Sequence, residues 1–251
     1  MSAIRIVVSD ADGTLLSRGK LLYPTDFGKA VAECAARNIP FAVASGRTLR
    51  ALRKIFAKWA DRLLFFAFDG AYISIGNLRL ADFPIGIEAL EAAKNLLSEG
   101  HAGIEFCTAE RSYLMSESSM LCESEKRRLG DEYADFGDFD GSAVYKLIVF
   151  ARQGGEIEIP GLHAVYRGER VIEFVRERVD KASAAALICK ELRIDPADLM
   201  AFGDSDNDLT LLKFAGQPVT IYGAKHEIFA LSDKHTKNAA EYVRLKLKQL
   251  E

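Results

Sequence analysis

Residues 4–16 of this chain read Ile4-Arg5-Ile6-Val7-Val8-Ser9-Asp10-Ala11-Asp12-Gly13-Thr14-Leu15-Leu16. The short apolar run from Ile4 to Val8 predicts a buried strand. This strand ends at two carboxylates, Asp10 and Asp12, and the glycine that follows permits the tight turn that takes the chain off the sheet. Because ligands of an open α/β sheet bind outside the carboxyl ends of its strands, the two aspartates predict a site. An Asp-rich turn that only closes the strand is the alternative interpretation.

The composition excludes several classes of function. The chain has 251 residues, enough for one large or two modest domains, and its formal net charge of −3 leaves no basic excess for nucleic acid. Its longest apolar runs are strand-sized, well short of the ~18 residues that span a bilayer, and no export signal is visible. Four scattered cysteines without a CxxC pair indicate reduced thiols. We therefore expect a cytoplasmic protein, monomeric or weakly dimeric, that binds neither membranes nor nucleic acid.

Strands and helices alternate after the first strand. Apolar runs at residues 39–44 and 63–68 predict two more buried strands, separated by helical patterns over residues 26–37 and from Thr48 to about residue 60. Helix-length connections between strands indicate right-handed crossovers and a parallel sheet. The second strand ends in Ser45-Gly46-Arg47, where a hydroxyl and exposed backbone N–H groups could bind a phosphoryl group. A helix N-cap at Ser45 or Thr48 is a compatible alternative.

Residues 82–176 do not continue the alternation of strands and helices. Strand patterns at 103–107, 112–115, 144–150, 162–166 and 171–175 follow one helical pattern that ends at Gly100. We interpret this block as a second α/β domain inserted into a core made of residues 1–81 and 177–251. The acidic stretch 131–140 within it is expected to be a solvated surface loop rather than a second metal site.

Two features mark the return to the core. Lys181 lies in the first turn of a predicted helix, where the positive end of the helix dipole disfavours a cation, so a bound anion would explain it; a surface lysine is the alternative. Residues 199–209 then repeat the opening pattern, because an apolar strand ends in a cluster of three aspartates, 204, 206 and 208, and Asn207. These are hard oxygen ligands suited to Mg²⁺, and they meet the first aspartates if the two strands are neighbours.

Four stretches in this order resemble the four motifs of the haloacid dehalogenase (HAD) superfamily of phosphohydrolases: Asp10-Ala11-Asp12-Gly13-Thr14, Ser45-Gly46-Arg47, Lys181, and Gly203-Asp204 with Asn207-Asp208. The resemblance covers the whole chain and is closest to class IIB, the Cof-type sugar-phosphate phosphatases, which carry an α/β cap where the insert lies here. It implies a doubly wound, Rossmann-like parallel-sheet core with an inserted α/β cap domain that sets substrate specificity. One departure is Asp69, which stands where the family often has Asn.

The resemblance also implies roles for individual residues. Asp10 would be the nucleophile that forms an aspartyl-phosphate, and Asp12 would protonate the leaving oxygen and then deprotonate the hydrolytic water. The phosphoryl group would be held by Ser45 and Lys181, with Gly46, Arg47 and Asn207 close to it. The ligands of Mg²⁺ would be Asp10, the backbone carbonyl of Asp12 and Asp204, with Asp208 in support.

These roles make an Mg²⁺-dependent phosphatase of small phosphorylated metabolites, either sugar phosphates or phosphoglycolate-like compounds, the leading hypothesis. A phosphomutase similar to phosphomannomutases and a non-catalytic module that keeps the metal site are the alternatives. Specificity would come from the cap, where the candidate contact residues are Arg111, Lys146, Arg167 and Arg170.

Overall fold

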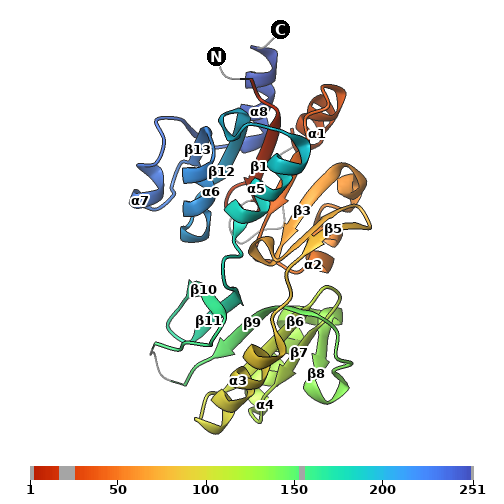
Figure 1. Cartoon of the computed structure of the whole chain (residues 1–251), viewed down its shortest axis with the longest axis vertical. Helices are drawn as coiled ribbons and strands as arrows, with labels where there is room; N and C mark the ends of the chain where they lie inside the picture. The colour runs from red at the N-terminus through yellow and green to blue at the C-terminus, as the bar shows by residue number, and fades with distance from the viewer. Residues whose placement is uncertain (1–2, 17–25, 153–155, 250–251) are drawn as a thin grey trace.

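The larger of two sheets in this computed structural model has eight strands, and β1 lies near its centre (Figure 1). The structure describes residues 3–16, 26–152 and 156–249. The strand order is β14-β13-β12-β1-β2-β3-β4-β5, parallel from β14 to β3 and antiparallel beyond it. The strands span Ile6–Asp10 (β1), Phe41–Ala44 (β2), Leu63–Ala67 (β3), Tyr72–Ile75 (β4), Leu78–Asp82 (β5), Leu199–Gly203 (β12), Gln217–Ile221 (β13) and His235–Thr236 (β14).

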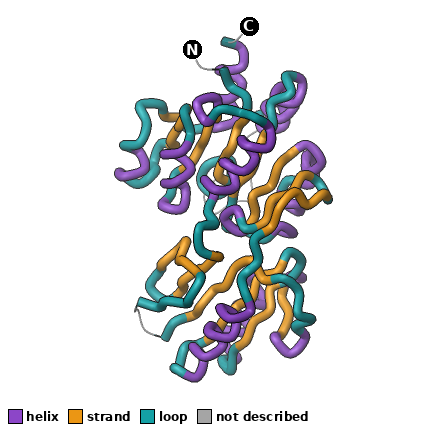
Figure 2. The backbone as a smooth tube through the Cα atoms, viewed as in Figure 1, coloured by secondary structure: helices purple, strands orange, loops and turns teal. Residues whose placement is uncertain are grey.

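Helices cover both faces of this sheet (Figure 2). Side chains alternate along β1, so Val7 packs into one apolar cluster with α1 and α8, whereas Ile6 and Val8 pack into another with α5 and α6. These helices and their shorter companions span Phe27–Ala36 (α1), Leu49–Ile55 (α2), Lys181–Leu192 (α5), Leu209–Phe214 (α6), His226–Phe229 (α7) and Ala239–Lys248 (α8). Burial on both faces explains why the parallel strands are continuous apolar runs.

The second sheet has six strands in the order β10-β11-β9-β6-β7-β8 and lies below the core in Figure 1. Two connections join it to the core, from β5 into α3 and from β11 into α5. Its elements span Ile87–Ser98 (α3), Gly103–Thr108 (β6), Ser112–Met115 (β7), Ser119–Leu129 (α4), Tyr133–Asp135 (β8), Val144–Phe150 (β9), Leu162–Arg167 (β10) and Val171–Arg176 (β11). The expected α/β fold, a doubly wound core with an inserted cap, is therefore confirmed.

The sequence predictions were wrong at three places. The helix predicted from Thr48 to residue 60 ends at Ile55, and a 3₁₀ segment, Ala57–Arg62, follows it. Helix α4 was not predicted, because it is strongly polar and lacks an apolar face: its one buried residue is Glu125. The acidic stretch 131–140 is not simply a solvated loop, since it contains β8 and two 3₁₀ turns, and Glu132 is buried.

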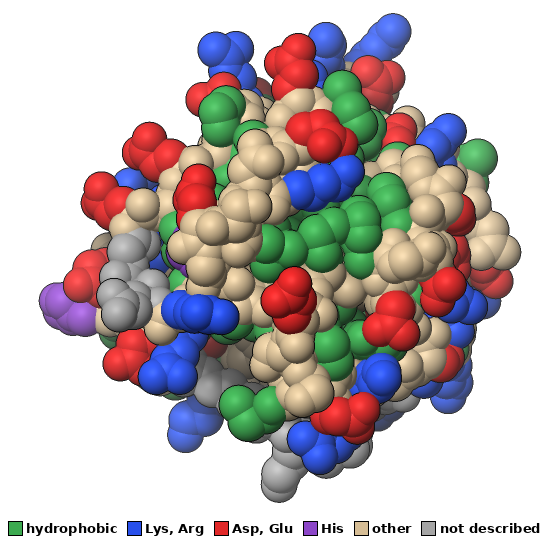
Figure 3. Space-filling view, turned by 90° about the horizontal axis from the view of Figure 1, so that it is seen from below, with side chains coloured by type: hydrophobic (Ala, Val, Ile, Leu, Met, Phe, Trp, Pro, Cys, Tyr) green, Lys and Arg blue, Asp and Glu red, His purple; other side chains and the backbone are tan. Residues whose placement is uncertain are grey.

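The surface shows charges of both signs. Seen from the cap end, acidic and basic side chains surround a group of hydrophobic side chains in the middle of the face (Figure 3). Within the described residues, none of the helices combines the length and the apolar composition needed to cross a bilayer.

Candidate active site

Three aspartates meet at the carboxyl edge of the core sheet. Strands β1 and β12 are parallel neighbours, with Ser9 opposite Phe202, so Asp10 and Asp204 leave the sheet at the same edge. One carboxylate oxygen each from Asp10, Asp204 and Asp208 lies within 4.8 Å of the others, and all three residues are buried. The two clusters that the sequence placed at strand ends thus form one site.

A glycine keeps the first loop close to this cluster. Gly13 has a φ of +88°, a conformation that L side chains rarely adopt, and a Cβ there would lie 2.5 Å from Asp204 Oδ2. The next residue, Thr14, donates a hydrogen bond of 3.4 Å from its hydroxyl to Asp204 Oδ1. The turn after β1 therefore packs directly on the carboxylate from β12.

Lys181 lies between two of the aspartates. Its Nζ donates to Asp10 Oδ1 at 2.6 Å and to Asp208 Oδ1 at 2.7 Å, and the lysine is completely buried. Asp180 caps the helix by accepting the backbone N–H of Ser183 at 2.7 Å, which fixes the first turn of α5. The alternative of a solvent-facing surface lysine is wrong.

The electrostatics of the cluster follow from burial and like charge. Burial and the neighbouring Asp208 carboxylate raise the pKa of Asp10 well above its usual value, although Lys181 acts in the opposite direction. Burial alone would lower the pKa of Lys181, but the charges of Asp10 and Asp208 raise it above its ordinary value. Asp208 is further held by the backbone N–H groups of Asp204 and Ser205, which donate to its Oδ2 at 3.0 and 3.1 Å.

The donor set fits a divalent cation. Asp10 Oδ2 is buried and has no hydrogen-bond partner within the described parts of the chain. An unpaired buried carboxylate oxygen is costly, and Asp10 and Asp208 share one lysine, so a cation would offset the excess negative charge. Carboxylate oxygens are the ligands that Mg²⁺ prefers. The carboxylate of Asp12 lies outside this cluster, and its predicted contribution through the backbone carbonyl stays a prediction.

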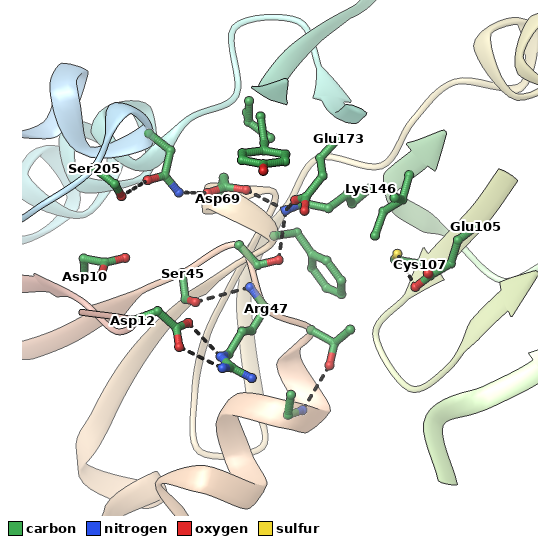
Figure 4. Close-up of a pocket in the computed structure, with 18 of the residues that line it drawn as sticks. Asp10, Asp12, Ser45, Arg47, Asp69, Glu105, Cys107, Lys146, Glu173 and Ser205 are labelled. Atoms are coloured by element: carbon green, nitrogen blue, oxygen red, sulfur yellow. Dashed lines mark hydrogen bonds and ion pairs between the residues drawn. The ribbon is translucent and has the colours of Figure 1, made fainter. Parts of the chain in front are cut away.

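Asp12 is paired with Arg47 (Figure 4). The guanidinium donates from Nε to Oδ2 and from Nη2 to Oδ1, both at 2.7 Å, which is the bidentate geometry typical of Arg and carboxylate. The backbone N–H of Arg47 donates to Ser45 Oγ at 3.2 Å. Ser45 and Arg47, two of the residues predicted near the phosphoryl group, thus lie beside Asp12, the predicted acid/base, and Arg47 binds its carboxylate.

A second lysine joins the cap to the core. Lys146 from β9 of the cap donates from Nζ to Gly46 O at 2.9 Å, to Asp69 Oδ2 at 2.7 Å and to Glu173 Oε2 at 2.7 Å. Asn207 donates to the other oxygen of Asp69 at 2.9 Å. Burial would raise the pKa of Asp69, but the charges of Lys146 and Lys181 and the hydrogen bonds from Lys146 and Asn207 together outweigh it and leave that pKa below its ordinary value. The predicted site residues Gly46 and Asn207 are therefore linked to the cap through Asp69 and Lys146.

One cavity of about 890 Å³ lies between the two sheets, and its lining includes the predicted site residues Asp10, Asp12, Ser45, Gly46, Arg47 and Asn207 together with Asp69 and Lys146. Lys181, Asp204 and Asp208 are buried and lie outside this lining. Among the four cap candidates, Lys146 lines it, whereas Arg111, Arg167 and Arg170 lie outside its lining. Sequence reasoning missed the four other charged lining residues of the cap, namely Glu105, Arg128, Glu132 and Glu173.

A sequence signal could have found part of this missed set. In β6, β9 and β11, residues 104, 106, 147, 149, 172 and 174 pack into the apolar interior of the cap. The residues that alternate with them along each strand face the opposite side of the cap sheet, toward the core domain. Glu105, Lys146 and Glu173 are the charged members of that second set. Two-residue alternation in β6, β9 and β11 thus marks the cavity-facing side of the cap sheet.

Comparison with known proteins agrees with this geometry. A family model described as haloacid dehalogenase-like hydrolase matches residues 7–242. The chain is 25% identical over 233 residues to a phosphoglycolate phosphatase of Methanopyrus kandleri, covering 91% of this chain and 88% of the relative. It is 25% identical over 230 residues to a 5-amino-6-(5-phospho-D-ribitylamino)uracil phosphatase of Escherichia coli, covering 85% and 83%. A solved HAD subclass IIB sugar phosphatase superposes with a TM-score of 0.77 at 18% identity, covering 96% and 98%.

The chain belongs to the haloacid dehalogenase-like hydrolase family. The expected family and the expected class of enzyme, a phosphatase of that family, are thereby confirmed.

Proposed function

We propose that this chain is an Mg²⁺-dependent phosphatase that hydrolyses small phosphorylated metabolites through an aspartyl-phosphate at Asp10. The observation that carries the proposal is how the two oxygens of this carboxylate are held at the cavity wall. Lys181 holds Oδ1, while Oδ2 is buried without a hydrogen-bond partner in the described part of the chain, at the wall of the cavity. A carboxylate that a buried lysine fixes at the wall of a cavity is suited to nucleophilic attack on a phosphoryl group bound there.

Mg²⁺, held by Asp10, Asp204 and Asp208 with the backbone carbonyl of Asp12, would supply the positive charge that lets a carboxylate approach a phosphate dianion. Lys181 contributes a second positive charge at the same place. Ser45 lines the cavity beside Asp12 and supplies a hydroxyl for a phosphoryl oxygen. Asn207 is held by Asp69 at the same wall.

Asp10 attacks phosphorus, the bond to the leaving oxygen breaks, and Asp12 gives its proton to that oxygen. Asp12 then takes a proton from water, whose oxygen attacks phosphorus; the bond between phosphorus and Asp10 breaks, which releases inorganic phosphate and restores the carboxylate of Asp10. For both steps Asp12 turns from Arg47 toward the cavity, and the freed guanidinium is then available to a phosphoryl oxygen. We propose that residues 82–176 act as the cap that excludes water during this transfer, with core residues 1–81 and 177–251 beneath.

Contacts across the cavity support closure by the cap. Besides the Lys146 bridge, Thr48 donates from its hydroxyl to Glu132 Oε2 at 2.6 Å. Arg50 at the start of α2 pairs with Asp131 at 2.6 Å. Both partners lie in the acidic stretch of the cap, so this stretch serves as a docking surface for the core.

The test is phosphate release from a panel of sugar phosphates, phosphoglycolate and nucleoside monophosphates, with Mg²⁺ and with EDTA. We expect release that requires Mg²⁺ and falls by about 10⁴-fold or more in Asp10→Asn. Asp233→Asn, at an exposed residue away from the cavity, is the matched control and should keep full activity. Transfer of phosphate between sugar hydroxyls without release would instead support the phosphomutase, and no turnover by folded, Mg²⁺-loaded protein would contradict both.

A further inference from the structure

The cap wall of the cavity holds a lysine whose donors are all in use. An ammonium group has three N–H donors, and those of Lys146 reach three acceptors, Gly46 O, Asp69 and Glu173. An incoming anion could bind this lysine only by displacing one of the acceptors. Lys146 therefore holds other groups in place and is not itself an open anion site.

The other cations of the cavity wall are also paired. In the described residues that line the cavity there are five cations, each in an ion pair with a carboxylate: Arg47, Lys54, Arg128, Lys146 and Lys225. The same wall carries seven carboxylates. Away from Asp10 and the proposed Mg²⁺ site, the cavity wall thus presents excess negative charge to a substrate.

Glu173 is the exposed member of the lysine bridge. Its side chain is 28% exposed, whereas the side chains of Lys146 and Asp69 are each 2% exposed. On β11 it pairs with Ile148 of β9 and Tyr166 of β10, which line the same cavity. Figure 4 shows Glu173 beside Lys146, at the end of the bridge away from Asp10 and Asp12. A leaving group that extends from the phosphoryl site toward the cap would meet this carboxylate.

We propose that Glu173, positioned by Lys146, selects the leaving group: it accepts a hydrogen bond from an uncharged, hydroxyl-bearing leaving group and repels one that carries a carboxylate. This rests on the proposed phosphatase function and names the substrate chemistry of that site. A carboxylate accepts hydrogen bonds and cannot donate one, so a hydroxyl satisfies it and a second carboxylate does not. The name of the Methanopyrus relative, a phosphoglycolate phosphatase, would favour the opposite preference.

The test uses pairs of substrates that differ only in this group. Glycerol 3-phosphate is compared with 3-phosphoglycerate, and the open-chain glucitol 6-phosphate with 6-phosphogluconate, as ratios of kcat/KM. We expect the uncharged member of each pair to be preferred by about 10-fold or more, because hydrogen bonds to charged groups give discrimination of this order. Glu173→Gln removes the repulsion and should lower the ratio about 10-fold, mainly through the KM of the acidic member, while Glu173→Asp keeps the charge and should retain most of the preference.

A surface variant and a binding measurement complete the design. Glu169→Gln, at an exposed residue in the turn before β11, should leave both ratios unchanged. Calorimetry of the same ligand pairs with Mg²⁺-loaded Asp10→Asn protein measures the preference without turnover, so it reports on the subsite even if the wild-type enzyme releases no phosphate. Equal or tighter binding of the acidic members, or a preference that Glu173→Gln leaves intact, would overturn the inference.

Discussion

Two buried lysines are each held between two carboxylates, but one lies within the core and the other lies where the cap meets the core. Lys181 joins Asp10 and Asp208, and all three belong to the core. Lys146 joins Asp69 of the core to Glu173 of the cap. The first cluster is complete whatever the position of the cap, whereas the second exists only while the cap sheet packs on the core. The comparison teaches that the aspartate cluster needs only the core, whereas the Lys146 bridge depends on how the cap packs on the core.

The largest expected effect is the loss of Lys181. Lys181→Met leaves two carboxylates buried without their cation, so we expect a loss of about 3–5 kcal/mol of stability in EDTA and a fall of about 10²–10³-fold in turnover with Mg²⁺. Urea unfolding and phosphate release measure the two. Lys190→Met, at an exposed residue on the same helix, is the control and should change neither. Wild-type stability in the Lys181 variant would show that the cluster does not depend on this cation.

The core cluster could be predicted from the sequence, and the cap cluster largely could not. Asp10 and Asp204 each end a continuous apolar strand, and the sheet rule brings such ends to one edge. Lys146 was named only as one of four cations of the cap that could contact the substrate. Its partner Asp69 is 77 residues away, and their contact depends on how the cap packs on the core.

Side-chain pairing also lay beyond sequence reasoning. Arg47 has several carboxylates within reach of the cavity, and nothing in its local pattern indicates that it binds Asp12. Helix α4, whose residue Arg128 reaches Glu105, has no apolar periodicity that would reveal it. Motif spacing thus locates strand ends, whereas contacts between domains depend on tertiary geometry.

The second prediction is that Mg²⁺ stabilises the protein through the core cluster and not through the cap cluster. Mg²⁺ at about 100 times its dissociation constant should stabilise the wild-type protein by about 2.7 kcal/mol, because it binds the folded state alone. Asp204→Asn removes a carboxylate of the core cluster and should abolish most of this gain, whereas Lys146→Met should preserve it. Urea midpoints with Mg²⁺ and with EDTA give the comparison. If Lys146→Met also removed the stabilisation by Mg²⁺, metal binding at the core cluster would depend on the cap cluster.

The third prediction disturbs the cap cluster alone. A Cβ on Gly46 would lie 2.9 Å from Lys146 Nζ and 3.1 Å from Asp69 Oδ2, so Gly46→Ala crowds the bridge without reaching Lys181. We expect a loss of about 1–3 kcal/mol, the range of overpacked sites. Gly86→Ala, where a Cβ meets nothing within 4 Å, should stay within about 0.5 kcal/mol of wild type. Equal urea midpoints for the two variants would show that the bridge yields to the added methyl group.

The smallest effect is a difference in sign between the clusters as pH changes. The pKa of Asp69 is lowered in the folded protein, since the charges of Lys146 and Lys181 and the hydrogen bonds to Asp69 together outweigh burial. Its contribution to stability is therefore present above the unfolded value of about 4 and is lost as pH falls through the folded value. The pKa of Asp10 is raised by burial and by Asp208, so in metal-free protein its contribution is full below about pH 4 and shrinks as pH rises.

Urea unfolding in EDTA from about pH 2 to pH 7 therefore distinguishes the two carboxylates. Asp69→Asn should fall further below wild type as pH rises toward about 4 and then stay level, because it lacks the charge that the surrounding cations stabilise. Asp10→Asn should become more stable relative to wild type as pH rises above about 4, because it avoids ionising a buried carboxyl beside Asp208. Parallel stability profiles for the two variants would mean that the surroundings of the two carboxylates do not set their protonation differently, and the contrast between the cluster within the core and the cluster shared with the cap would lose its electrostatic basis.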